Sequence, residues 1–124
     1  MKGVLLVNLG SPDSPEKKDV KKYLAQFLMD ERVIDEPLWL RTLLVKGIIL
    51  NTRPRKSAKA YKKIWWDEGS PLIVLSERLL KKVDKMTSLP ISLAMRYGNP
   101  SIEKGIKELS DKGVTDILLI PLYP

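Results

Sequence analysis

The residues best suited to chemistry lie between positions 51 and 71, where basic and aromatic side chains are interleaved. They are Arg53, Arg55, Lys56, Lys59, Tyr61, Lys62, Lys63, Trp65 and Trp66. A guanidinium binds a carboxylate through two parallel hydrogen bonds, and aromatic rings stack on flat apolar groups. The segment could therefore bind an anion with a flat apolar body, or single-stranded nucleic acid. A third interpretation is an amphipathic helix that buries Tyr61, Ile64 and Trp65 and leaves its lysines in solvent.

Two residue types that carry much of enzyme chemistry are missing, because the 124 residues include no histidine and no cysteine. The lack of cysteine excludes disulfides, thiolate metal sites and cysteine nucleophiles on this chain. The lack of histidine removes the commonest acid/base residue near neutral pH and the commonest nitrogen ligand of metals. The sequence motifs of P-loops, dinucleotide-binding folds and serine hydrolases are absent as well.

Four acidic residues flank Val33 and Ile34, and they are Asp30, Glu31, Asp35 and Glu36. Carboxylates in such numbers could ligate a hard divalent cation. A solvated connector between helices, with some carboxylates near helix ends, is the favoured interpretation.

Composition and charge place the chain among ordinary globular domains. The apolar fraction is 44% and the charged fraction 30%, and 22 basic against 15 acidic residues give a net charge of +7, which favours anionic partners. The longest apolar stretch, residues 38–50 from Leu38 to Leu50, is interrupted by Arg41 and Lys46 and is shorter than the ~20 residues that a membrane span needs. We expect a cytoplasmic protein.

The first half of the chain predicts one strand and several helices. Residues 4–9 form an apolar run, interrupted only by Asn8, that fits a buried strand followed by a loop at Gly10. Ser14 and Pro15 predict a helix start, with Ser14 as the N-cap. The buried stripe of that helix is Val20, Tyr23, Leu24, Phe27 and Leu28. Two more helices are predicted over residues 38–50 and 55–65, and a turn over residues 67–71.

The second half predicts alternating helices and strands. A helix over residues 72–86 should turn one face inward, made of Leu75, Leu79, Leu80 and Val83. A short strand follows at 91–95 with an exit loop at 96–100. Ser101 should cap a helix that ends at Gly113, with an inner face of Ile102, Ile106 and Leu109. Residues 117–122 predict a third buried strand. The alternation favours an α/β fold, a parallel sheet with helices on both faces, whose functional loops follow the carboxyl ends of the strands.

Several motifs, in order along the whole chain, resemble those of one family. They are LVNLGSP at 6–12, RVID at 32–35, GSPL at 69–72, MRYGNPSI at 95–102 and PLYP at 121–124. This series is similar to the ferrochelatases, which insert ferrous iron into protoporphyrin IX in haem biosynthesis. The resemblance implies two similar α/β lobes facing each other across a porphyrin cleft, in chains more than twice this length. Residues 1–124 then correspond to a single amino-terminal lobe, a three-layer parallel-sheet unit with Rossmann-like βαβ units.

The resemblance also implies roles for particular residues. Leu9 matches a position against the macrocycle, where some relatives have an iron-ligating tyrosine, so the chain resembles the protoporphyrin-using branch. The positions that hold propionates or line the pocket are matched by Arg53, Tyr61 and Ser70. The strand-end positions of the family are matched by Arg96, Tyr97 and Tyr123. The family's catalytic histidine and glutamate lie in the second lobe, so no catalytic and no metal-binding residue is assigned to this chain.

The expected function is therefore that of a ferrochelatase represented by its porphyrin-binding lobe, which is inactive alone. Its substrates would be Fe²⁺ and protoporphyrin IX, with no resident cofactor. Its partners would be the missing carboxyl-terminal lobe or a second copy, and a membrane surface touched peripherally by residues 38–50. Two alternatives remain open: a half-size tetrapyrrole chelatase that forms a homodimer, and a non-catalytic binding module for nucleic acid or an acidic partner, of which nucleic acid is the less favoured.

Overall fold

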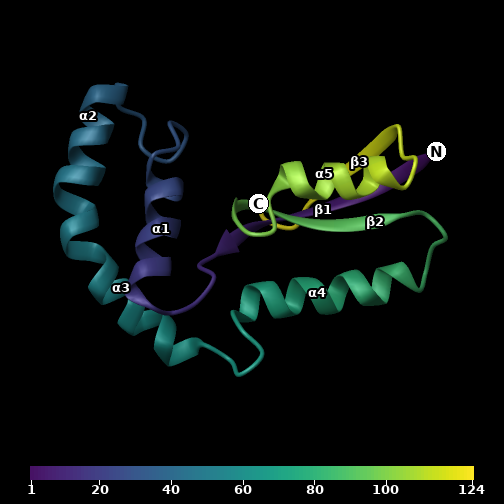
Figure 1. Ribbon diagram of the computed structural model, residues 1–124, viewed down its shortest axis with the longest axis horizontal. Coiled ribbons are helices and arrows are strands. Elements are labelled where there is room, and N and C mark those ends of the chain that lie inside the picture. Colours follow the sequence, from purple (N-terminus) through teal and green to yellow (C-terminus); the bar gives the residue numbers. More distant parts are fainter. The chain divides into compact units, whose positions relative to one another are not determined.

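Three parallel strands form one sheet in the order β2-β1-β3 (Figure 1). The computed structural model describes residues 1–124, and the strands are β1 (Lys2–Ser11), β2 (Ile91–Gly98) and β3 (Asp116–Pro121). The predicted α/β class with a parallel sheet is confirmed. The chain folds as two compact units, one made of residues 1–11 and 71–124 and the other of residues 12–70, and we describe each by itself.

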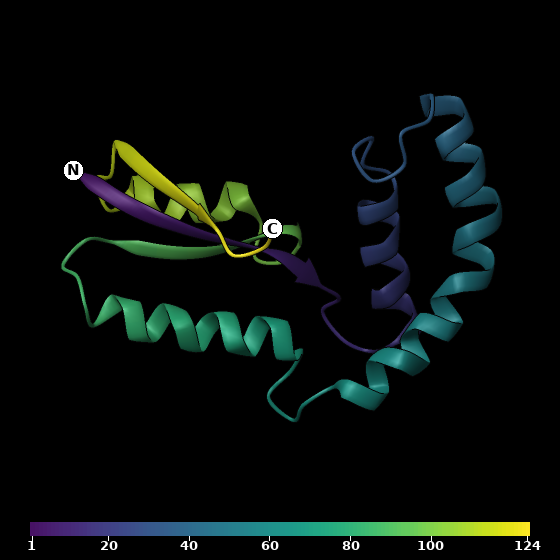
Figure 2. The ribbon, with the colours of Figure 1, turned by 180° about the vertical axis from the view of Figure 1, so that it is seen from behind.

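In the first unit, two helices lie on opposite faces of the sheet (Figures 1 and 2). Helix α4 (Pro71–Asp84) packs over one cluster and helix α5 (Ile102–Asp111) over the other. The α4 cluster is Val4, Leu6, Ile91, Leu93 and Met95. The α5 cluster is Leu5, Val7, Ala94, Leu109 and Val114. Alternate residues of β1 therefore serve opposite faces, as the period of a strand requires.

The predicted inner face of α4 is partly wrong. Leu80 and Val83 pack against the sheet, but Leu75 is 53% exposed and Leu79 is 39% exposed. Ser76 is buried instead. A helix turns about 100° per residue, so a face that passes through Ser76, Leu80 and Val83 leaves Leu75 and Leu79 to one side.

The prediction that the third strand is buried is wrong. The apolar residues of β3 are 37–62% exposed, because α4 and α5 pack on β1 and β2 and leave both faces of β3 open. Since β3 is also an edge strand, it pairs with a neighbour on one side only. The strand itself was placed correctly along the sequence.

Helix α5 begins and ends as predicted, but one inward position differs. The Ser101 hydroxyl accepts a hydrogen bond from the Lys104 amide at 3.1 Å, and Gly113 follows the helix with a φ of +87°. Ile106 was expected inside and is 43% exposed. Gly105 faces the sheet in its place, since a Cβ there would lie 2.8 Å from Leu5 Cδ1 and 3.1 Å from Ala94 Cβ.

The second unit is helical. Helix α1 (Lys17–Leu28) packs against a continuous helical run made of α2 (Leu38–Thr42), the π-helical η1 (Leu43–Ile49) and α3 (Leu50–Ile64). Leu28, Val45 and Leu50 form its buried core. The break predicted between residues 50 and 55 is wrong, because the chain stays helical through Pro54. Pro54 has no N–H to donate to the Leu50 carbonyl, so α3 continues through it with one helical hydrogen bond fewer.

Ser14 does not act as the N-cap of α1. The N-cap position is Glu16, without a side-chain cap, and the helix starts at Lys17. The Ser14 hydroxyl accepts from the Glu16 amide at 3.1 Å and donates to the Asp19 carboxylate at 2.5 Å. Ser14 therefore stabilises the turn before the helix and ties it to the first helical turn. The predicted stripe is confirmed, with Val20, Tyr23 and Leu28 buried.

Candidate functional site

In the first unit, the carboxyl end of β1 is fixed by an unusually close approach of two strands. The loop predicted at Gly10 is wrong, because β1 stays paired with β2 through Ser11. Gly10 pairs with Tyr97 in the parallel register and has a φ of +126°. A Cβ at Gly10 would lie 1.9 Å from the Tyr97 carbonyl oxygen, so no side chain fits there. Glycine is required at this position by both the backbone conformation and the contact. The half-buried Leu9 is thereby held beside the carboxyl end of β2.

A chain of hydrogen bonds fixes the same end of β1 to α4. Asn8 Nδ2 donates to Ser76 Oγ at 3.0 Å, and that hydroxyl donates to the Leu72 carbonyl at 2.7 Å. Asn8 Oδ1 accepts from the Leu9 amide at 2.8 Å. This support of Leu9 was not predicted, although a serine among the apolar residues of a helix was a visible signal for it.

Arg96 and Tyr97 lie within the carboxyl end of β2. The Arg96 guanidinium carbon is 4.7 Å from the ring centroid of Tyr97, which is a cation–π distance. Arg96 is exposed and Tyr97 is buried. Residues 96–98 were predicted as an exit loop and are strand instead. The loop shortens to Asn99 and Pro100, because the Met95 amide donates to the Pro100 carbonyl at 2.7 Å and closes the turn.

Tyr123 follows β3 at the same edge of the sheet. The Leu122 amide donates to the Val7 carbonyl at 2.7 Å, which continues the pairing of β3 with β1 past the end of the strand. Tyr123 is half-buried and packs against the α5 cluster. The first unit thus gathers Leu9, Arg96, Tyr97 and Tyr123 at the carboxyl ends of its three strands, where open parallel sheets usually place ligands.

In the second unit, one side of α3 carries Arg53, Ser57 and Tyr61. Their spacing of four residues places them one above another on the helix surface, over a rise of about 12 Å from Arg53 to Tyr61. Ser57, Ala60, Tyr61 and Ile64 line an open pocket of about 330 Å³. Ser57 was not among the predicted site residues, although its position midway between Arg53 and Tyr61 on one helix could have identified it.

Tyr61 is positioned as a neutral hydrogen-bond donor. Its ring packs edge-on against Trp65, with ring centroids 6.2 Å apart and an angle of 80° between the planes. Burial raises the pKa of the Tyr61 phenol above 10.0, its usual value, because a phenolate loses hydration there. Arg53, by contrast, is exposed and carries its positive charge one helical turn before Ser57.

Ser70 occupies a different place from Arg53 and Tyr61. It is buried and follows a tight turn in which Trp66 and Gly69 exchange two backbone hydrogen bonds of 3.1 Å and 3.0 Å. It does not line the α3 pocket. The turn predicted at residues 67–71 is confirmed, and Ser70 immediately precedes Pro71, the first residue of α4.

The acidic residues of the connector do not form a metal site. No group of three or more His, Cys, Asp or Glu side chains is arranged to hold a metal ion in residues 1–124. The Asp30 carboxylate accepts from the Arg32 amide at 2.9 Å, which is a turn-forming bond. None of the helices combines the length and the hydropathy needed to cross a bilayer.

Comparison with known proteins gives a consistent result over the whole chain. The family model described as ferrochelatase matches residues 1–124. The chain is 58% identical over 122 residues to the ferrochelatase of Azotobacter vinelandii, 57% to that of Stutzerimonas stutzeri and 48% to that of Vibrio atlanticus. Each comparison covers 98% of this chain but only 36–38% of the relative, so the chain spans little more than a third of the length of these curated relatives.

Proposed function

Since the chain belongs to the ferrochelatase family, we propose that it supplies the porphyrin-binding part of an enzyme that inserts ferrous iron into protoporphyrin IX. Both the iron and the porphyrin are substrates of that reaction. The proposal depends on one side of α3. The Arg53 cation and the hydroxyl groups of Ser57 and Tyr61 lie there in line, beside an apolar pocket.

The two ends of this α3 surface suit the two parts of a porphyrin. The Arg53 guanidinium would pair with a propionate carboxylate through two hydrogen bonds, and the protonated Tyr61 phenol would donate to the same rim. Ala60 and Ile64 offer apolar surface to the macrocycle. Ile64 is 58% exposed, and an apolar ligand would remove that surface from water.

In the first unit, we assign the carboxyl ends of the strands to the same task. Leu9 would contact a face of the macrocycle, and as an aliphatic side chain it cannot ligate iron. Gly10, Asn8 and Ser76 hold the backbone of Leu9 in place and so make this contact stiff. Arg96, Tyr97 and Tyr123 belong to the proposed wall at these strand ends. In the second unit, Ser70 is proposed as a further residue that lines the porphyrin pocket.

Binding of this kind would contribute to metal insertion by helping to bend the porphyrin ring. A planar porphyrin must bend before a metal can reach its pyrrole nitrogens, and the cost of bending has to come from contacts elsewhere on the substrate. In the second unit, the proposed contact of Arg53 with a propionate would supply part of this binding energy. In the first unit, the proposed contact of Leu9 with the macrocycle would supply another part. The group that accepts the pyrrole protons would lie in the polypeptide outside this chain, which contains no histidine.

A porphyrin titration of the chain, read at the porphyrin absorbance band, tests the proposal. Arg53→Ala should weaken affinity by roughly 1.5–3 kcal/mol, the range for a hydrogen bond to a charged group. Esterified propionates should remove most of that difference, because an ester cannot form the charge-assisted pair. Lys62→Ala, a neighbour of the same charge, is the matched control and should change little.

Equal losses for the two variants that disappear at high salt would mean that the cluster acts only as a diffuse positive field. Tighter binding of a single-stranded oligonucleotide than of porphyrin would favour the alternative of a nucleic-acid module. The isolated chain is also proposed to lack metal insertion. Measured insertion by a homodimer of the chain would favour the half-size chelatase instead.

A second partner is proposed from the distribution of charge. Residues 38–66 contain eight of the 22 basic residues and none of the 15 acidic ones, so the rest of the chain is almost neutral with 14 basic and 15 acidic residues. The same segment exposes large apolar side chains, which are Leu38, Trp39, Leu43, Ile48, Ile64 and Trp66. Exposed apolar residues beside a basic surface are typical of helices that lie on anionic membranes. We assign the apolar part of this segment, residues 38–50, to peripheral contact with the membrane, in the cytoplasm. Sedimentation with vesicles should show binding that requires anionic lipid.

A further inference from the structure

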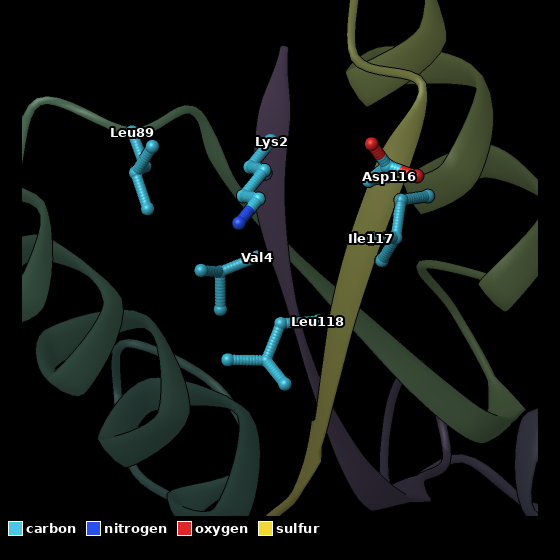
Figure 3. Close-up of a pocket in the computed structure, with 7 residues that line it drawn as sticks. Lys2, Val4, Leu89, Asp116, Ile117 and Leu118 are labelled. Atoms are coloured by element: carbon cyan, nitrogen blue, oxygen red, sulfur yellow. The ribbon is translucent and has the colours of Figure 1, made fainter.

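The carboxyl end of β1 has fewer strand neighbours than its start. At the start, β1 runs between β2 and β3, and the paired residues Val4 and Leu118 lie side by side in Figure 3. The register with β3 ends at Val7, so beyond it β1 has a strand neighbour only in β2. Among residues 4–11, Leu9 is the one without a register partner in β2. Sheet pairing therefore holds Leu9 less firmly than its neighbours.

An asparagine side chain accepts the hydrogen bond of the Leu9 amide. That amide donates to Asn8 Oδ1 at 2.8 Å, and Asn8 Nδ2 donates in turn to Ser76 Oγ on α4 at 3.0 Å. If the Asn8 side-chain amide were turned over, its NH₂ group would face the Leu9 N–H, and two donors would oppose each other. The orientation of one side-chain amide therefore decides whether the Leu9 amide has its acceptor.

Ser76 fixes that orientation. A serine hydroxyl has a single proton to donate, and Ser76 gives it to the Leu72 carbonyl at 2.7 Å. The Ser76 oxygen can then only accept, so Asn8 must turn its NH₂ group to Ser76 and its Oδ1 to Leu9. Because the Leu72 carbonyl lies one turn earlier in the same helix, the direction of the whole chain of hydrogen bonds is set by the backbone of α4.

Ser76 occupies a position where the packing of α4 would favour an apolar residue. It is only 3% exposed, and Leu72 and Leu80, one turn to either side of it, pack against the sheet. A buried hydroxyl costs free energy unless it is hydrogen-bonded, and a serine fills less of the core than a leucine would. The bonds of Ser76 satisfy its hydroxyl and connect α4 to the strand end at which Leu9 lies.

We propose that Ser76 is a positioning residue of the porphyrin site, because it fixes the Asn8 amide and thereby holds the Leu9 backbone in the place from which Leu9 contacts the macrocycle. Ser76 is buried, so it does not touch the substrate itself. This role rests on the proposed function, in which Leu9 contacts a face of the macrocycle. A contact residue that is ordered before binding loses less conformational freedom when the ligand arrives, which strengthens binding.

Hydrogen exchange of backbone amides, followed by NMR, tests the positioning itself. In Ser76→Ala the Leu9 amide loses its fixed acceptor and should exchange roughly tenfold faster or more, as in a local opening. The Val7 amide, in a residue paired with both neighbouring strands, should keep its rate. Ser92→Ala is the matched control and should leave the Leu9 amide unchanged. Ser92 is also a buried serine, and its hydroxyl bonds to a side chain of α5 at 3.2 Å.

A double-mutant cycle on porphyrin affinity tests whether Ser76 acts through Leu9. Titrations with protoporphyrin IX compare the chain with Ser76→Ala, Leu9→Ala and the variant that carries both changes. Ser76→Ala should weaken affinity roughly twofold to tenfold, the cost of ordering one contact side chain on binding. In the Leu9→Ala background the same change should cost less than about twofold, because the contact that Ser76 positions is already lost. Ser92→Ala should leave the affinity unchanged.

The positioning role is overturned if Ser76→Ala leaves either the exchange of the Leu9 amide or the porphyrin affinity unchanged. It is also overturned if the loss of affinity is the same with and without the Leu9 side chain, or if Ser92→Ala has equal effects. Any of these results leaves the proposed function intact, provided that Leu9→Ala and Arg53→Ala weaken porphyrin binding. If the chain does not bind porphyrin, or if neither of those two variants changes its affinity, the proposed function fails and the role of Ser76 fails with it.

Discussion

Two neighbouring strands of this protein have nearly the same apolar sequence and very different surroundings. Residues 4–7 of β1 read VLLV and residues 117–120 of β3 read ILLI, and the two strands are paired side by side. The four β1 residues are 0–8% exposed, whereas the four β3 residues are 37–62% exposed. An apolar run therefore predicts a strand, but what packs on the strand decides whether it is buried.

The largest test of this comparison uses one register pair. Leu5 is fully buried and its partner Leu119 is 52% exposed. Leu5→Ala should lower the free energy of unfolding by about 2–5 kcal/mol, since it removes buried apolar surface and leaves a cavity. Leu119→Ala should lower it by less than about 1 kcal/mol, as surface substitutions do. Urea unfolding followed by circular dichroism measures both, and equal losses would show that β3 is covered in solution.

The packing of α5 on β1 can be tested at Gly105, because the lack of a side chain at this position allows α5 to approach Leu5 closely. A Cβ at this position would lie 2.8 Å from Leu5 Cδ1 and 3.1 Å from Ala94 Cβ, so Gly105→Ala must shift the buried Leu5 side chain or move the helix away from the sheet. We expect a loss of about 1–3 kcal/mol in the free energy of unfolding, the usual cost of overpacking.

Gly47→Ala is the matched control for Gly105→Ala, also within a helical segment. The nearest atom to a Cβ at Gly47 is Leu43 Cδ1 at 3.7 Å, an ordinary contact. This variant should be neutral or more stable by up to about 1 kcal/mol, because alanine is the better helix former. A loss at Gly47 as large as that at Gly105 would mean that the close approach to Leu5 is not the cause.

A smaller effect is expected at the start of the same helix. Ser101→Ala removes the hydroxyl that accepts from the Lys104 amide, which should cost about 1 kcal/mol of unfolding free energy. Ser101→Asn should restore most of it, since asparagine caps helices well. Ser110→Ala, at an exposed serine in the last turn, should change stability little. If the asparagine variant is as unstable as the alanine variant, the side chain at position 101 does not act as a cap.

The features that were predicted correctly are those decided by a few adjacent residues. The strand at residues 4–9, the Ser101 cap, the Gly113 stop and the turn before Ser70 all depend on local sequence. The features that were missed depend on neighbours distant in sequence: the exposure of β3, the inward position of Gly105, and the bond from Asn8 to Ser76. The candidate site divides in the same way. Arg53 and Tyr61 could be named from the resemblance, but their alignment with Ser57 on one side of α3 required the helix to run unbroken through Pro54.

The smallest predicted effect concerns a titration, where the surroundings of a residue again decide its behaviour. Burial raises the pKa of Tyr61 in the folded protein above the value of 10.0 that it has when unfolded. Above that pH the unfolded chain releases this proton more readily than the folded chain, so unfolding becomes more favourable as the pH rises. The stabilisation linked to this group is fully present below pH 10 and is lost as the pH passes through the folded pKa. Tyr61→Phe should therefore flatten the alkaline fall in the free energy of unfolding, measured by urea titrations at a series of pH values, and leave its value near pH 7 almost unchanged.

The chain has three other tyrosines, so the difference between the two proteins, rather than the fall itself, reports on Tyr61. If the two proteins lose stability in parallel above pH 10, the Tyr61 phenol is not shielded from water in the folded protein.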